Sequence, residues 1–160
     1  ELEGRTGDIP VKMLIDAGIF GAFINHPNNK MTLADIERTV RIARTLRLYT
    51  VVFSNNVAVS AAISKTDPNA IAFSSPELLR EDISVSTAQS EIIENHVKRI
   101  AMENSRVVSL CATGIKIPKD IVKALELGAH GAIISDAFIK SKRPENTLTE
   151  FVTAAIEVTK

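Results

Sequence analysis

The chain has 160 residues, of which 45% are hydrophobic and 24% charged, and its 19 basic residues balance its 19 acidic residues. Such a composition is typical of a folded globular protein and excludes a disordered one. The absence of net charge argues against nucleic acid or an anionic membrane surface as a partner. The length predicts a single domain, 1–160, with a substantial core.

The numbers and spacing of cysteine and histidine residues argue against disulfide bonds and metal sites. A single cysteine, Cys111, excludes an internal disulfide framework and a multi-cysteine metal site, and no two of the three histidines share metal-ligand spacing. The first residues lack the basic and apolar regions of a secretory signal, and no apolar run reaches the ~20 residues that cross a membrane. We therefore expect a cytoplasmic protein with no metal and no cofactor.

Short apolar runs alternate with longer amphipathic segments along the chain. A helix is expected at 9–17, with no strand before it. The later apolar runs are too short for helices and several are rich in Val, Ile, Phe or Tyr, which is typical of buried parallel strands. These predicted strands are Gly21–Ile24, Leu48–Phe53, Ala70–Phe73, Arg106–Leu110 and Gly131–Ile134.

A capping pattern marks the helix after the first strand. Thr32 is followed three residues later by Asp35, as in a capping box. Apolar residues then recur at helical spacing, which predicts an amphipathic helix. These residues are Leu33, Ile36, Val40 and Ala43.

Similar signals mark the later helices. Pro118 suits the first turn of a helix that is predicted to stop at Gly128. Thr147 with Glu150 repeats the capping pattern before a last helix that is predicted to end near Val158. A further helix is expected around an apolar stripe formed by Ile93, Val97 and Ile100.

Strands that alternate with helices predict a parallel sheet of right-handed βαβ units. Two architectures fit five such units: five-eighths of a TIM-type (β/α) barrel, or a complete flavodoxin-like sheet. A closed eight-stranded barrel needs about 250 residues, or about 200 at the low end. The pattern alone leaves both open.

A faint internal repeat points to the edge of the sheet where a ligand would bind. Segments 16–24 and 126–134 each pass from a helix end through two glycines into an apolar strand. The repeat places Asn25-His26 and Ser135-Asp136 beyond the carboxyl ends of two strands, where α/β proteins bind ligands. A histidine there can act as a general acid or electrophile, or serve only as a loop residue.

The other polar residues after strands have simpler interpretations. Asn55-Asn56 reads as a turn with a helix cap, and Ser74-Ser75 as a loop before Pro76. Residues 112–116 lead into a helix N-terminus and form a weak candidate anion site. Cys111 is predicted to be a buried, inert thiol, and His96 and His130 to be structural or solvent-facing.

From Gly4 to about Lys142 the chain resembles the archaeal branch of the triosephosphate isomerase family, starting after that family's third barrel strand. The resemblance favours an incomplete TIM-type barrel of α/β class, in which the five visible strands are the family's fourth to eighth. The segments that carry it, in order, are Arg5-Thr6-Gly7, Ala17-Gly18, Ile24-Asn25-His26, Met31-Thr32-Leu33-Ala34-Asp35, Ser54-Asn55-Asn56, Ser60-Ala61-Ala62, Pro76-Glu77-Leu78, Ile83-Ser84-Val85-Ser86, Leu110-Cys111, Gly114-Ile115 and Leu125-Glu126-Leu127-Gly128-Ala129.

The same resemblance shows departures at the positions that carry the family's chemistry. His26 matches the electrophilic histidine, but Pro27-Asn28 replaces the Ser-Glu that follows it. Ser74 stands at the position of the catalytic glutamate, and Arg80-Glu81-Asp82 replaces the glycine-rich lid. The family has two phosphate-binding turns that contact the substrate. At these two positions this chain has Thr113-Gly114 and Ser135-Asp136-Ala137.

Two hypotheses follow from the resemblance. The first is a degenerate member that does not isomerise on its own and serves as a binding or structural subunit. The alternative is an active triosephosphate isomerase whose missing strands come from additional chain or a partner, with Glu77 or Asp136 as base. Unpaired edges at 21–24 and 131–134 predict a homo-oligomer or a chain that completes the barrel. A small phosphorylated metabolite is the expected ligand class.

Overall fold

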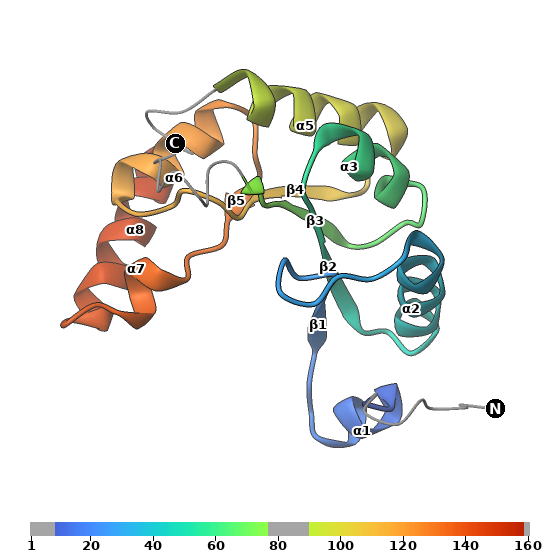
Figure 1. Cartoon of the computed structure of the whole chain (residues 1–160). Helices are drawn as coiled ribbons and strands as arrows, with labels where there is room; N and C mark the ends of the chain where they lie inside the picture. Colours follow the sequence, from blue (N-terminus) through green and yellow to red (C-terminus); the bar gives the residue numbers. More distant parts are fainter. Residues whose placement is uncertain (1–8, 77–89, 159–160) are drawn as a thin grey trace.

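A curved, five-stranded parallel sheet organises the protein (Figure 1). The structure, a computed structural model, describes residues 9–76 and 90–158. The elements in chain order are α1 (Val11–Asp16), β1 (Gly21–Ile24), α2 (Leu33–Thr45), β2 (Tyr49–Ser54), α3 (Val57–Ser64), β3 (Ala70–Phe73), α5 (Ser90–Glu103), β4 (Val108–Cys111), α6 (Pro118–Glu126), β5 (Gly131–Ala132), α7 (Asp136–Ile139) and α8 (Pro144–Val158).

The strand order distinguishes the two architectures that the pattern left open. The strands lie in the order β1-β2-β3-β4-β5, so each pairs in parallel with its neighbour along the chain. A flavodoxin-like sheet has the order 2-1-3-4-5, whereas a barrel winds consecutively. The predicted incomplete TIM-type barrel is therefore confirmed.

One face of the sheet is covered by helices α2, α3, α5 and α6 (Figure 1). Ile24, Val52 and Ile71 point into a core that they share with Val40 and Ile100. A second core lies towards the end of the chain, among residues of α5, β4, α6 and α8. Its buried members are Ile93, Cys111, Ile115, Ile121, Ala124, Leu127, Ala129 and Phe151.

The opposite face, which would line the interior of a barrel, is less well covered by the described residues. Side chains alternate between the faces of a strand, so Phe23 lies on this interior face and is 62% exposed. Phe53, on the same face of β2, packs edge-to-face against Phe23 with ring centroids 5.5 Å apart.

Local caps confirm several predicted boundaries. The Asp35 amide donates to Thr32 Oγ1 at 3.1 Å, and the Val59 amide donates to Asn56 Oδ1 at 2.8 Å. Gly128, just beyond α6, has a φ of +91°, a conformation that glycine adopts without steric cost. The helix ends are therefore fixed by residues within a few positions of them, as the sequence pattern indicates.

Several boundaries differ from the prediction, and β2 is shifted by one residue to Tyr49–Ser54. β4 begins at Val108 instead of Arg106, and β5 spans only Gly131–Ala132. The last helix begins at Pro144, because proline at a first helical position loses no intrahelical hydrogen bond. Thr147 therefore lies inside α8, where its hydroxyl bonds to the carbonyl of Arg143 at 3.2 Å.

Candidate functional site

The loop after β1 positions the candidate histidine at the carboxyl edge of the sheet. Asn25 adopts a left-handed conformation with φ +58° and is buried. Its Nδ2 donates to the Phe53 carbonyl at 2.9 Å, and its Oδ1 accepts the Met31 amide at 2.8 Å. These two bonds anchor the start and the end of the loop that carries His26.

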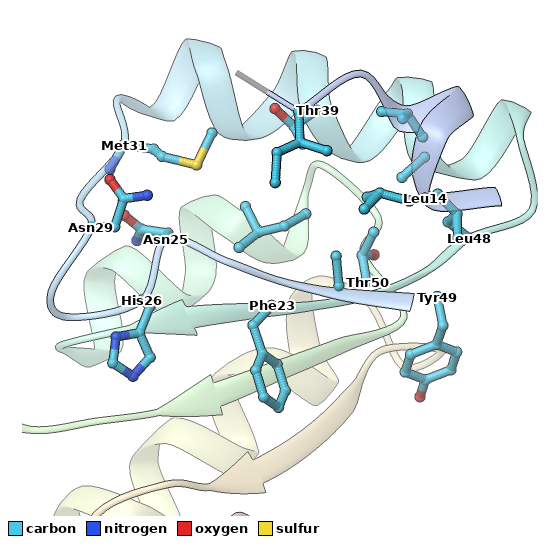
Figure 2. A pocket seen from close by; sticks show the side chains of 15 residues that line it. Leu14, Phe23, Asn25, His26, Asn29, Met31, Thr39, Leu48, Tyr49 and Thr50 are labelled. Atoms are coloured by element: carbon cyan, nitrogen blue, oxygen red, sulfur yellow. The ribbon is translucent and has the colours of Figure 1, made fainter. Parts of the chain in front are cut away.

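His26 is exposed, and its contacts define which ring nitrogen carries the proton. The Asn28 amide donates to Nδ1 at 3.3 Å, so a neutral ring bears its proton on Nε2. The ring packs edge-to-face on Phe53, with centroids 4.9 Å apart. Figure 2 shows the side chains of His26 and Phe23 on the same side of β1, the interior side. His26 can thus donate a hydrogen bond from Nε2 to a ligand at this edge.

Ser74 follows β3, two strands from His26. Its amide donates to the Ser54 carbonyl at 2.8 Å, and the residue is 4% exposed. β2 lies between the two strand ends, so His26 and Ser74 are about 10 Å apart across the edge. Among the described residues, none provides a hydrogen bond to Ser74 Oγ that would activate the hydroxyl.

A buried polar cluster lies beneath this edge. Ser60 Oγ is 2.8 Å from Ser54 Oγ and 2.9 Å from His96 Nδ1, and all three residues are at most 1% exposed. Ser60 also donates to the Asn56 carbonyl at 2.9 Å, an atom that can only accept. Because Ser60 has a single hydroxyl proton, it donates only one bond at a time, to Ser54 Oγ or to the Asn56 carbonyl, and its role toward His96 Nδ1 depends on the tautomer of the ring.

His96 Nε2 has no hydrogen-bond partner in the described structure. Burial of the ring, which packs against Phe73 with centroids 4.8 Å apart, lowers the pKa of His96 to about 4. The cluster was not predicted as a unit. The apolar stripe at 93, 97 and 100 was the available signal, because His96 lies beside it on α5.

The turn after β4 contains Thr113 and Gly114. Gly114 has a φ of +70°, and Thr113 is 1% exposed, with no partner for its hydroxyl in the described structure. The nearby amides of Lys116 and Ile117 both donate to Asp120 Oδ2 at 2.9 Å. A carboxylate of the protein therefore already occupies the start of α6, where an anion would otherwise bind.

Ser135 and Asp136 lie at the carboxyl end of β5 and are exposed. Asp136 opens the four-residue helix α7 and forms an ion pair with Lys140, with Oδ2 and Nζ 2.6 Å apart. The structure therefore presents a carboxylate at the position where the resemblance implies a phosphate-binding turn.

The predicted residues thus follow successive strand ends along one edge of the sheet. Cys111 is buried, as predicted, and burial raises the pKa of its thiol to about 11. His130 is exposed, and its Nδ1 is 2.9 Å from Ser109 Oγ. Glu77 and the segment 80–82 lie outside the described residues.

A cavity of about 200 Å³ adjoins only one end of this edge (Figure 2). It lies beside β1, between α1 and α2, and Asn25, His26 and Asn29 line its polar end. Its lining does not include Ser74, Thr113 or Asp136. Within residues 9–76 and 90–158, no cluster of three or more metal-ligating side chains is present and no helix is long and apolar enough to cross a membrane.

Similarity to solved structures defines the class of the fold. Thiamine phosphate pyrophosphorylase from Pyrococcus furiosus superposes with a TM-score of 0.70 at 14% identity, covering 94% of this chain and 66% of that one. The Amycolatopsis orientalis BexX/CysO complex gives a TM-score of 0.66 at 18% identity, covering 92% of this chain and 59% of that one. At such identities only the fold is shared, and it is of the TIM-barrel type.

Sequence similarity defines the family more narrowly, although no family model matches the chain. The triosephosphate isomerase of Methanobrevibacter smithii is 38% identical over 149 residues, which is 93% of this chain and 67% of that protein. The Archaeoglobus fulgidus enzyme is 40% identical, covering 92% and 66%, and the Methanocaldococcus jannaschii enzyme is 36% identical, covering 92% and 68%. The chain belongs to the triosephosphate isomerase family and spans about two thirds of the length of these relatives.

Proposed function

We propose that this member of the triosephosphate isomerase family does not interconvert triose phosphates on its own and acts as a non-catalytic binding or structural subunit. The observation that carries the proposal is Ser74, which stands where the family's motif has its glutamate. Ser74 is almost fully buried, and no described residue activates its hydroxyl.

The chemistry requires a base at this position. Isomerisation of a triose phosphate removes a proton next to a carbonyl group, and the family uses a glutamate for it with a neutral histidine as electrophile. An unactivated serine hydroxyl does not take that proton at neutral pH. The loss of a general base lowers a rate by about 10²- to 10⁴-fold.

The anion-binding positions support the same conclusion. The carboxylate of Asp136 repels a phosphate, by roughly 4 kcal/mol at 4 Å and an effective dielectric constant near 20, before screening by salt and by Lys140. The amides at the start of α6 already bond to Asp120. Weak phosphate binding also removes the binding energy that positions a substrate.

One observation favours the alternative, an active isomerase completed by further strands. His26 accepts the Asn28 amide at Nδ1, so a neutral ring carries its proton on Nε2, the nitrogen that remains for a ligand. This is the tautomer in which a neutral histidine can donate to a substrate oxygen, as an electrophilic histidine does. Under this alternative Glu77 or Asp136 serves as the base.

An isomerase assay tests the proposal. The chain is incubated with dihydroxyacetone phosphate, and formation of glyceraldehyde 3-phosphate is followed alongside the M. smithii enzyme as a positive control. We expect no turnover above the buffer rate from the wild type or from the Ser74→Ala variant. Turnover by the wild type that His26→Ala abolishes contradicts the proposal and favours the alternative.

A further inference from the structure

The opposite edge of the sheet, where the strands begin, carries a group of arginines. Arg47 precedes β2, Arg106 precedes β4, and Arg44 lies in the last turn of α2. Because the strands are parallel, these residues lie one strand length, about 13 Å, from the edge that carries His26 and Ser74. β2, β3 and β4 each pair with a strand on both sides, so the arginines lie at the fully paired part of the sheet.

Asp67 holds two of these arginines side by side. Arg44 Nη1 and Arg106 Nη2 both form ion pairs with Asp67 Oδ2, the second at 3.1 Å. Asn104 Nδ2 donates to Oδ1 at 2.8 Å, and this bond together with the two arginines keeps the pKa of Asp67 below its usual range. The Asp67 side chain is 21% exposed, against 49% for Arg44 and 74% for Arg106. An approaching anion therefore meets the guanidinium groups before it meets the carboxylate.

Most of the donors in this group are unused in the described structure. An arginine has five N–H donors, and Arg44 and Arg106 each use one of them on Asp67. The Arg47 side chain has no ion-pair or hydrogen-bond partner among the described residues, although it lies next to Arg44 in the lining of one cavity. The three guanidinium groups thus have donors left for a ligand.

Asn69 adds an oriented amide between the arginines. Its Oδ1 accepts the Thr50 amide at 2.8 Å, which makes Nδ2 the opposite end of the side chain. Within the part of the chain that the structure describes, Nδ2 has no acceptor. Asn69 precedes β3, so it lies between Arg47 at the start of β2 and Arg106 at the start of β4.

Two cavities of about 310 Å³ each lie at this edge. Arg44, Tyr49 and Asn69 line both of them, Arg47 lines the first, and Arg106 lines the second. Three guanidinium groups against one carboxylate leave a net charge of +2 around the two cavities. The chain as a whole has no net charge, so positive charge is concentrated here.

We propose that this edge binds the phosphoryl group of a small phosphate monoester through Arg44, Arg47, Arg106 and the Asn69 amide. Arginine binds phosphate oxygens through paired N–H···O bonds, and a compact group of three guanidiniums supplies donors to all three free oxygens of a monoester. A monoester carries a charge of about −2 at neutral pH, which balances the charge of the site. The site is separate from the carboxyl edge and does not depend on whether that edge isomerises a substrate.

The test titrates inorganic phosphate into the full chain at pH 7.5 and constant ionic strength, followed by ¹⁵N NMR. We expect saturable shifts of the Arg47 and Arg106 backbone amides and of the Asn69 side-chain amide, with one common dissociation constant. Sodium chloride at the same ionic strength should not produce these shifts, since it screens charge without occupying the site. Shifts that are absent, that do not saturate or that chloride reproduces overturn the proposal.

A variant without the unpaired arginine locates the site. Arg47→Asn should weaken phosphate binding at least tenfold, because it removes a charged donor. Arg47 has a φ of +59°, a conformation that asparagine adopts more readily than arginine, so the variant should fold. Arg143→Asn removes the same charge at an exposed position before α8 and is the matched control, which should bind like the wild type. Equal phosphate affinity of the two variants overturns the proposal.

A second variant distinguishes binding from a purely structural role of the arginines. Arg106→Gln removes one exposed ion pair with Asp67, which contributes little to stability. We expect phosphate affinity to fall at least fivefold while the urea midpoint stays close to that of the wild type. A lower midpoint with unchanged affinity would assign the arginines to stability alone and overturns the proposal. None of these measurements involves isomerase turnover, so their outcome is independent of the proposed function.

Discussion

At the scale of single residues, His96 governs how stability depends on pH. Its pKa is lowered to about 4 in the folded protein by burial, against about 6.5 in an unfolded chain. Above pH 6.5 the ring is neutral in both states. As the pH falls from 6.5 to 4, the unfolded state binds a proton that the folded state does not, so the free energy of unfolding decreases.

We expect the wild type to lose about 2 kcal/mol of unfolding free energy through this group between pH 7.5 and pH 5. The measurement is urea denaturation at both pH values. His96→Gln retains a donor for Ser60 but does not titrate, so its loss should be smaller by that amount. His130→Gln, at an exposed site, is the control and should behave like the wild type. Identical pH dependence in wild type and His96→Gln would show that His96 does not carry the effect.

The sequence indicated where single site residues lie, but it did not indicate which side chains contact one another. It placed His26 and Ser74 after strands, because an apolar run followed by polar residues marks a strand end. It did not show that Ser54, Ser60 and His96 meet. These residues are up to 42 positions apart, and only the packing of α3 and α5 on the sheet brings them together.

At the scale of elements, the contact between β1 and β2 depends on a missing side chain. A Cβ at Gly21 would lie 2.5 Å from the Tyr49 carbonyl oxygen, a backbone atom that cannot move aside alone. A Cβ at Gly131 in β5 would meet Leu110 Cδ2 at 3.3 Å, the end of a flexible side chain. Gly21 and Gly131 occupy equivalent positions in the sequence repeat. A side chain would clash with backbone at Gly21, but only with a flexible side chain at Gly131.

Gly21→Ala should destabilise the protein by about 1–3 kcal/mol, because the clash forces a backbone shift. Gly131→Ala, the matched control, should cost clearly less. Thermal and urea denaturation of both variants measure the difference. Equal losses of stability in the two variants would contradict the prediction that the backbone contact at Gly21 makes its substitution more costly.

The cap of α2 provides a second test at this scale. Thr32→Ala removes the acceptor for the Asp35 amide and should lower the free energy of unfolding by about 1 kcal/mol. Thr32→Ser keeps the hydroxyl and should retain most of the stability. Urea denaturation of both variants checks this, and an unchanged midpoint for Thr32→Ala would exclude a stabilising role for the cap.

At the scale of the whole molecule, the sheet is protected at its centre and exposed at its ends. All four residues of β3 are at most 2% exposed, whereas Phe23 in β1 is 62% exposed. Exposed edges open locally at a lower free energy than the centre of a core. The asymmetry follows from consecutive winding, which leaves both ends of the sheet without a neighbour in the described structure.

Native-state hydrogen exchange should therefore be slowest in β3 and faster in β1 and β5. In the isolated chain the rates should differ by at least tenfold. Uniform exchange across all strands would indicate that the described edges are covered in solution.

The sequence by itself determined the five apolar strands, the caps at Thr32 and Asn56 and the stop at Gly128. These features depend on neighbours a few residues away, so local patterns carry them. Only the tertiary structure decided the strand order, the buried Ser54–Ser60–His96 cluster and the group of arginines around Asp67. Strand order and side-chain contact join distant residues, and their free energy depends on which faces pack together in space.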